Sequence, residues 1–156
     1  MKEFVKLDKY GQLYIDKVLF ESYLPIVFTC VNDKKDVFIG VCCQNNEKGC
    51  KWLLGKTNGI NIVRMLRDEI TIRQLLLEYS FENISVDYVE DKYVISYNNS
   101  DWDESSPYLP KEDSYMYGEK VKAYLRRGAK PLAAFGRYPN EEIGYGVLCV
   151  RDSLPV

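Results

Sequence analysis

The chain has 156 residues, of which 46% are hydrophobic and 28% charged, and its formal net charge is −2. This composition excludes a wholly disordered chain, and the length predicts a single domain, residues 1–156, with a hydrophobic core. The weak net charge argues against a protein that holds nucleic acid through its overall field, and no apolar run is long enough to cross a membrane.

Two features of the sequence predict a cytoplasmic protein. The N-terminal residues lack the apolar core of a signal peptide. The five cysteines are an odd number, and two of them, Cys42 and Cys43, are adjacent, which makes a poor disulfide framework. We therefore expect reduced thiols that pack as small apolar side chains.

The first half of the chain predicts a β-meander followed by two helices. Apolar and aromatic runs at residues 13–20, 25–31, 37–43 and 51–54 are separated by short polar turns, which favours antiparallel pairing. Side chains suited to capping then mark the starts of the helices. Asn58 can cap a helix that ends near Arg67, and Thr71 with Gln74 can form a capping box for the next helix.

The second half of the chain predicts fewer elements. Alternating apolar residues indicate a hairpin over residues 86–97, and a last strand is expected at residues 143–150. Residues 98–113 are polar and acidic with two prolines, so we expect a mobile loop there. An apolar stripe predicts a helix over residues 117–127. The fold class expected from these elements is α+β, with an antiparallel β-meander sheet and two or three helices packed on one face.

The residue types present exclude several kinds of active site. The chain has no histidine, which excludes Ser-His-Asp and Cys-His catalysis and the usual mixed Cys/His zinc sites. The spacing of Cys42, Cys43 and Cys50 does not match the paired knuckles of a four-cysteine zinc site. Glycine-rich loops of the kinds that bind phosphate are also absent. The sequence therefore predicts no catalytic residue, no metal site and no cofactor.

Two carboxylate patterns leave alternatives open. Residues 90–92 (Glu-Asp-Lys) partly match the E-x-K element of restriction-type nucleases, although they lie at a predicted turn. This match is the basis of one alternative function, a metal-dependent nucleic-acid enzyme that uses carboxylates. Oxygen-bearing side chains from Asp101 to Glu112 follow the spacing of a calcium loop, but Ser106 stands where that loop requires glycine. Cation binding at this loop is left open.

The strongest binding signal is a basic stretch within the predicted helix over residues 117–127. The candidate partner-binding residues are Lys120, Lys122, Tyr124, Arg126 and Arg127. Cations near the end of a helix also interact with its dipole, so a solvated charged face is the alternative. The functional interpretation is an interface for another protein with an acidic surface, and a nucleic-acid backbone is the less favoured partner. The sequence predicts no membrane partner and leaves the oligomeric state open.

The first half of the chain resembles a group of uncharacterised small proteins, with a domain of unknown function, from Gram-positive bacteria and their mobile elements. The resemblance lies in residues 13–21 (LYIDKVLFE), 25–30 (PIVFTC), 51–54 (KWLL), 65–66 (ML) and 70–73 (ITIR). It carries no functional residue, but it implies a bacterial or phage setting, where small domains often act as inhibitors, immunity proteins or antitoxins. We therefore expect a non-enzymatic protein-interaction domain, with a nucleic-acid-binding module as a further alternative.

Overall fold

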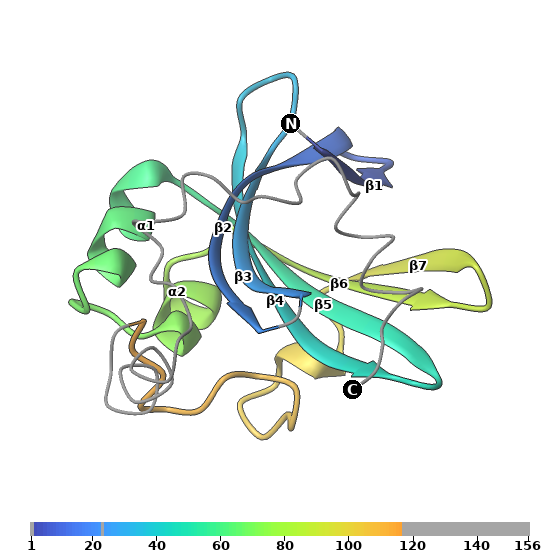
Figure 1. The fold of residues 1–156 in the computed structure, drawn as a ribbon. Coiled ribbons are helices and arrows are strands. Elements are labelled where there is room, and N and C mark those ends of the chain that lie inside the picture. Colours follow the sequence, from blue (N-terminus) through green and yellow to red (C-terminus); the bar gives the residue numbers. More distant parts are fainter. Residues whose placement is uncertain (1, 23, 117–156) are drawn as a thin grey trace.

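The computed structural model describes residues 2–22 and 24–116, which form one seven-stranded antiparallel sheet and two short α-helices (Figure 1). The strands are β1 (Lys2–Leu7), β2 (Gly11–Ser22), β3 (Leu24–Val31), β4 (Val37–Asn46), β5 (Gly49–Thr57), β6 (Glu82–Val89) and β7 (Lys92–Tyr97). The helices are α1 (Gly59–Leu66) and α2 (Ile72–Glu78), and a 3-10 turn, η1, spans Ser100–Trp102. The order of the strands in the sheet is their order in the sequence.

The expected α+β class is wrong, because the sheet dominates the described residues and curls into a nearly closed, barrel-like shape. Both described helices lie in the single connection between β5 and β6 and pack on one side of the sheet (Figure 1). Three irregularities of pairing interrupt β2 where it meets β3, and such bulges bend and twist a strand. The helix expected at residues 117–127 and the strand expected at 143–150 lie outside the described residues.

The strands expected in the first half of the chain are confirmed, and each is longer than expected. The hairpin expected at residues 86–97 is also confirmed, with Glu90 and Asp91 at its turn, both with positive φ. The sequence interpretation missed β1, which pairs with β2 and forms one edge of the sheet.

Both faces of the sheet are buried, which gives the domain two apolar cores. The inner core fills the curl, and there Phe4 of β1 packs edge-to-face on Phe28 of β3 and on Trp52 of β5, with ring centroids 5.3 and 5.0 Å apart. The outer core joins the opposite face of the sheet to α1, α2 and the chain after β7. Neighbouring residues of β5 therefore serve different cores, because successive side chains of a strand point to opposite faces: Trp52 and Leu54 point inward and Leu53 outward.

The N-terminal caps expected for both helices are confirmed. The Asn58 side chain accepts a hydrogen bond from the Asn61 backbone N–H at 2.9 Å. Thr71 Oγ1 accepts from the Gln74 N–H at 2.9 Å, and Gln74 Oε1 accepts from the Thr71 N–H at 2.9 Å. This reciprocal pair satisfies two backbone donors that the first turn of α2 leaves without an intrahelical partner.

We expect Thr71→Ala to lower the free energy of unfolding by about 1 kcal/mol, because it removes one half of the capping box. The measurement is the denaturant midpoint at unchanged slope. Thr71→Ser keeps the hydroxyl and is the matched control, so its midpoint should stay close to that of the wild type. Equal losses in the two variants would show that the methyl group, rather than the cap, stabilises this position.

Candidate functional site

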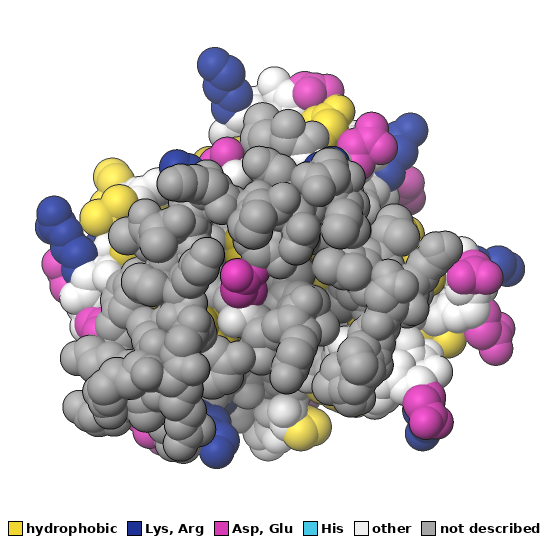
Figure 2. All heavy atoms as spheres, viewed as in Figure 1, with side chains coloured by type: hydrophobic (Ala, Val, Ile, Leu, Met, Phe, Trp, Pro, Cys, Tyr) yellow, Lys and Arg dark blue, Asp and Glu magenta, His cyan; other side chains and the backbone are white. Residues whose placement is uncertain are grey.

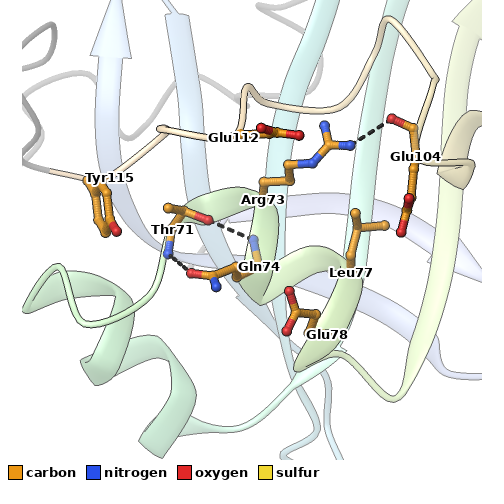
Figure 3. Close-up of a pocket in the computed structure, with 8 residues that line it drawn as sticks. All are labelled: Thr71, Arg73, Gln74, Leu77, Glu78, Glu104, Glu112 and Tyr115. Carbon is orange, nitrogen blue, oxygen red and sulfur yellow. Dashed lines mark hydrogen bonds between the residues drawn. The ribbon is translucent and has the colours of Figure 1, made fainter.

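A cleft of about 320 Å³ opens between α2 and the chain that follows η1 (Figure 3). We call it the α2 cleft. Its lining residues are Thr71, Arg73, Gln74, Leu77, Glu78, Glu104, Glu112 and Tyr115. Residues of the capping box thus form one side of the cleft, and residues far along the sequence form the other. Its volume falls at the small end of the range of ligand-binding sites.

The α2 cleft is acidic. Glu78, Glu104 and Glu112 are exposed, and none of the ion pairs between described residues includes them. The one cation of the lining, Arg73, is held by backbone carbonyls: its guanidinium donates to Pro110 O at 3.0 Å and to Glu104 O at 2.6 Å. Figure 3 shows the Glu104 carboxylate pointing away from that guanidinium. Three carboxylates and one engaged cation give the cleft a negative potential that favours a cationic ligand.

A buried ion cluster fixes the chain after β7 to the sheet. Lys51, in β5, points to the outer face, and its ammonium lies 2.8 Å from Asp87 Oδ1 and 2.9 Å from Asp101 Oδ2. We call these three residues the ion triad. Next to it, Trp102 is buried and donates from Nε1 to Ser85 Oγ at 3.1 Å. These contacts place η1 on the sheet and thereby position Glu104 at the edge of the α2 cleft.

The electrostatics of the ion triad favour a structural role over a nucleophilic one. Burial alone would lower the pKa of Lys51, but hydrogen bonds to Asp87 and Asp101, and the charges of both carboxylates, outweigh burial and raise it. The ammonium therefore stays protonated near neutral pH, and a protonated lysine has no lone pair for attack. Burial likewise raises the pKa of the nearby Cys43 thiol, which keeps it in the unreactive thiol form.

A second charged cluster joins the turn after β1 to the start of β6. The Tyr10 hydroxyl donates a hydrogen bond to Glu82, and Lys9 Nζ lies 3.0 Å from the same carboxylate. Burial would raise the pKa of Glu82, but the hydrogen bonds from Tyr10 and Lys9 lower it. The cluster links two distant strands of the curled sheet, so we assign it to closure of the fold rather than to a binding site.

Large apolar side chains are exposed beside the helices. On α1, Ile60 is 74% exposed and Val63 is 45% exposed. Phe81, which lies just before β6, is 70% exposed. We call these three residues the helical patch. Figure 2 shows hydrophobic side chains at the surface on the side of the molecule where Figure 1 places α1. The Phe81 N–H donates to Lys56 O at 2.7 Å, which places Phe81 at the same end of β5 from which α1 begins.

The partner-binding residues predicted from the sequence lie outside the described residues; they are Lys120, Lys122, Tyr124, Arg126 and Arg127. The two ends of the calcium-type spacing have different roles in the structure. Asp101 forms an ion pair with Lys51, and Glu112 lines the α2 cleft. Within residues 2–22 and 24–116, no three His, Cys, Asp or Glu residues are grouped so as to hold a metal ion. Neither described helix has the length and apolar character that crossing a membrane requires.

The expected mobile loop, residues 98–113, includes both η1 and one side of the α2 cleft. Trp102 and Leu109 are buried within it, and Arg73 holds two of its carbonyl groups. The mobility of this segment stays a prediction, as does the single-domain organisation of residues 1–156.

Comparisons of the chain with protein-family models, with curated proteins and with solved structures gave no match. The resemblance to small proteins of Gram-positive bacteria therefore stays a prediction, and functional arguments rest on the residues themselves.

Proposed function

We propose that this protein is a non-enzymatic protein-binding domain of a bacterium or phage, acting in the cytoplasm as an inhibitor, immunity protein or antitoxin. The observation that carries the proposal is the helical patch. Ile60 and Phe81 leave 74% and 70% of their surface in water although the same chain buries two apolar cores. Adjoining exposed apolar groups mark surfaces that a partner covers, and Ile60 and Val63, three residues apart on α1, share one face of that helix.

The surroundings of the helical patch support an interface. Protein interfaces combine an apolar centre with a polar rim, and aromatic residues carry much of their binding energy. Phe81 supplies the aromatic group, and its backbone is fixed by the hydrogen bond to Lys56. Arg64, on the same helix as Ile60, lies 3.8 Å from Glu69, and the pair supplies rim charges of both signs. A partner would therefore meet a preorganised surface.

We further propose that the partner presents an acidic surface. The basis is the basic stretch at residues 120–127, since cations grouped around Tyr124 have the composition of an interface for carboxylates. The helical patch would then supply apolar contact, and the basic stretch would supply charge complementarity.

The double substitution Ile60→Glu with Phe81→Glu should weaken partner binding by roughly thirtyfold or more, because it places charges in the apolar centre of the interface. The full chain serves as bait in an extract of its native host, and captured proteins are quantified by mass spectrometry. Affinity is then measured with the purified partner by calorimetry.

The matched control is Val94→Glu, which changes a side chain that is 53% exposed on β7, away from the helices. We expect this control to bind as the wild type does. Equal binding by the double variant would remove the helical patch from the interface. Absence of any specific partner for the wild-type chain would count against the binding function itself.

A further inference from the structure

The chain that follows β7 packs on the outer face of the sheet without adding a strand to it. We call residues 99–116 the strap, and Figure 1 shows this segment, in yellow and orange, running from the end of β7 past α2. Among the described residues, a single hydrogen bond between backbone groups joins the strap to another element, from the Ile72 N–H to Ser114 O at 2.7 Å. The pairing of the seven strands is therefore complete without the strap.

Side chains of the sheet hold the strap at η1. Ser85 is fully buried in β6, opposite the outward-facing Leu53. Its Oγ donates to Asn99 Oδ1 at 3.1 Å and accepts from Trp102 Nε1 at 3.1 Å. The ion triad adds the contact from Lys51 to the aspartate between these two residues. One hydroxyl and one ammonium group thus anchor this end of the strap.

The other end of the strap completes the cap of α2. Ser114 accepts two hydrogen bonds from the first turn of the helix: its carbonyl accepts from the Ile72 N–H, and its Oγ accepts from the Arg73 N–H at 3.2 Å. Donors in the first turn of a helix have no partner within the helix itself. These two N–H groups therefore lose their partners when the strap moves away.

The apolar contacts of the strap come from a few side chains. Trp102, Leu109 and Met116 are its buried apolar residues, and all three belong to the outer core. They recur every seven residues, so no long stretch of the strap can leave the surface without exposing one of them. A segment that adds no strand and buries few side chains opens at a lower free energy than a sheet does.

We propose that the strap is a lid that undocks from the outer face as one unit while the sheet stays folded. The undocked state exposes the apolar outer face of the sheet and frees the first turn of α2 from Ser114. A ligand that prefers this state shifts the equilibrium toward it, so the strap is a conformational device through which the outer face can be regulated. The proposal does not depend on the binding function proposed above, because undocking is a property of the purified protein alone.

The test is native-state hydrogen exchange of the full chain, measured by NMR for single N–H groups. Three groups report undocking because each is hydrogen-bonded between the strap and another element: the Ile72 and Arg73 backbone N–H and the Trp102 indole N–H. We expect the three to share one opening free energy, lower than that of the backbone N–H groups of β4 and β5. The proposal is overturned if the three groups open independently of one another, or only together with these strands in global unfolding.

Two neighbouring substitutions in β6 separate undocking from global unfolding. Ser85→Ala removes an anchor of the strap, so exchange of the Ile72 and Arg73 N–H should become roughly tenfold faster. The Trp102 indole is not counted in this variant, because it loses its own acceptor. The matched control is Ile84→Val, which removes a methyl group from the inner core.

Ile84→Val should speed exchange in β4 and β5 several-fold, because it destabilises the sheet, and should leave all three reporting groups at the wild-type rate. Equal acceleration of the reporting groups and of the strands in this control would show that the strap leaves only when the sheet unfolds. Unchanged exchange of the Ile72 and Arg73 N–H in Ser85→Ala would show that the two ends of the strap do not undock together. Either result overturns the proposal.

Discussion

Lys51→Ala should lower the free energy of unfolding by about 3 kcal/mol, the largest effect that we expect from a single charged residue of this chain. The substitution leaves Asp87 and Asp101 facing each other on the outer face of the sheet without their shared cation. Removing one partner of a buried ion pair is costly because the remaining charge has lost its counter-ion and stays desolvated. We place the effect at the lower end of the usual range because the side chain of Asp87 is 27% exposed.

The control for Lys51 is the triple variant Lys51→Met, Asp87→Asn and Asp101→Asn, measured by the same denaturant unfolding. It removes all three charges and keeps similar volumes, so it should be more stable than Lys51→Ala. If Lys51→Ala is as stable as the wild type, the ion triad does not hold the chain after β7 on the sheet.

The stability due to Lys51 should also depend on pH in a defined direction. The folded protein raises the pKa of this lysine above its unfolded value of about 10.4. The contribution is therefore complete below about pH 10.4 and is lost as the pH rises through the folded value. Unfolding free energies of the wild type and Lys51→Ala should accordingly converge in alkaline solution.

Gly49→Ala should destabilise the protein by about 3 kcal/mol, since it combines backbone strain with a steric clash. Gly49 begins β5 with a φ of +133°, a conformation that residues with a Cβ rarely adopt. An added Cβ would also lie far closer to the Tyr88 carbonyl oxygen than van der Waals contact allows, and this oxygen belongs to the backbone of β6 and cannot rotate away. Thermal unfolding should show a clear drop in the midpoint.

Gly59→Ala is the matched control for Gly49→Ala. Gly59 is the first residue of α1, and an added Cβ there meets no atom within 4 Å. Alanine restricts the unfolded chain and favours helix, so this variant should be as stable as the wild type or more stable by up to about 1 kcal/mol. Similar losses of stability at the two positions would show that replacing a glycine is destabilising in itself, whatever its position in the fold.

Local features of the fold could be predicted from the sequence, whereas its curvature could not. Alternating apolar residues indicated the strands, and short polar side chains indicated the caps at Asn58 and Thr71, because these signals act between neighbours in the sequence. β1 was missed because a bulge between Glu3 and Lys6 puts Phe4 and Val5 both inside, which destroys the alternation of period two. The α+β class was wrong for a related reason, since the bulges that curl β2 leave no mark in the hydrophobic pattern.

The candidate sites also divide into those that neighbouring residues reveal in the sequence and those that only the folded structure brings together. The basic stretch is visible in the sequence because its cations are neighbours. The ion triad is not, because Asp87 and Asp101 lie far from Lys51 in the sequence. One signal could have found it: Lys51 is a lysine between two buried residues, Cys50 and Trp52, in a strand that is apolar on both faces. A charge in that position requires an opposite charge from elsewhere in the chain.

The agreement between strand order and sequence order affects how the chain can fold during its synthesis. Each strand pairs with the one made just before it, so every hairpin from β1 to β5 can close without waiting for later residues. Proteins whose contacts are local in the sequence reach the native state faster than those that depend on distant pairings. The connection between β5 and β6 is the exception, since α1 and α2 must be made before β6 can pair. A chain made from its N-terminus therefore completes β1 to β5 before β6, and the edge of the sheet at β5 stays open until β6 emerges.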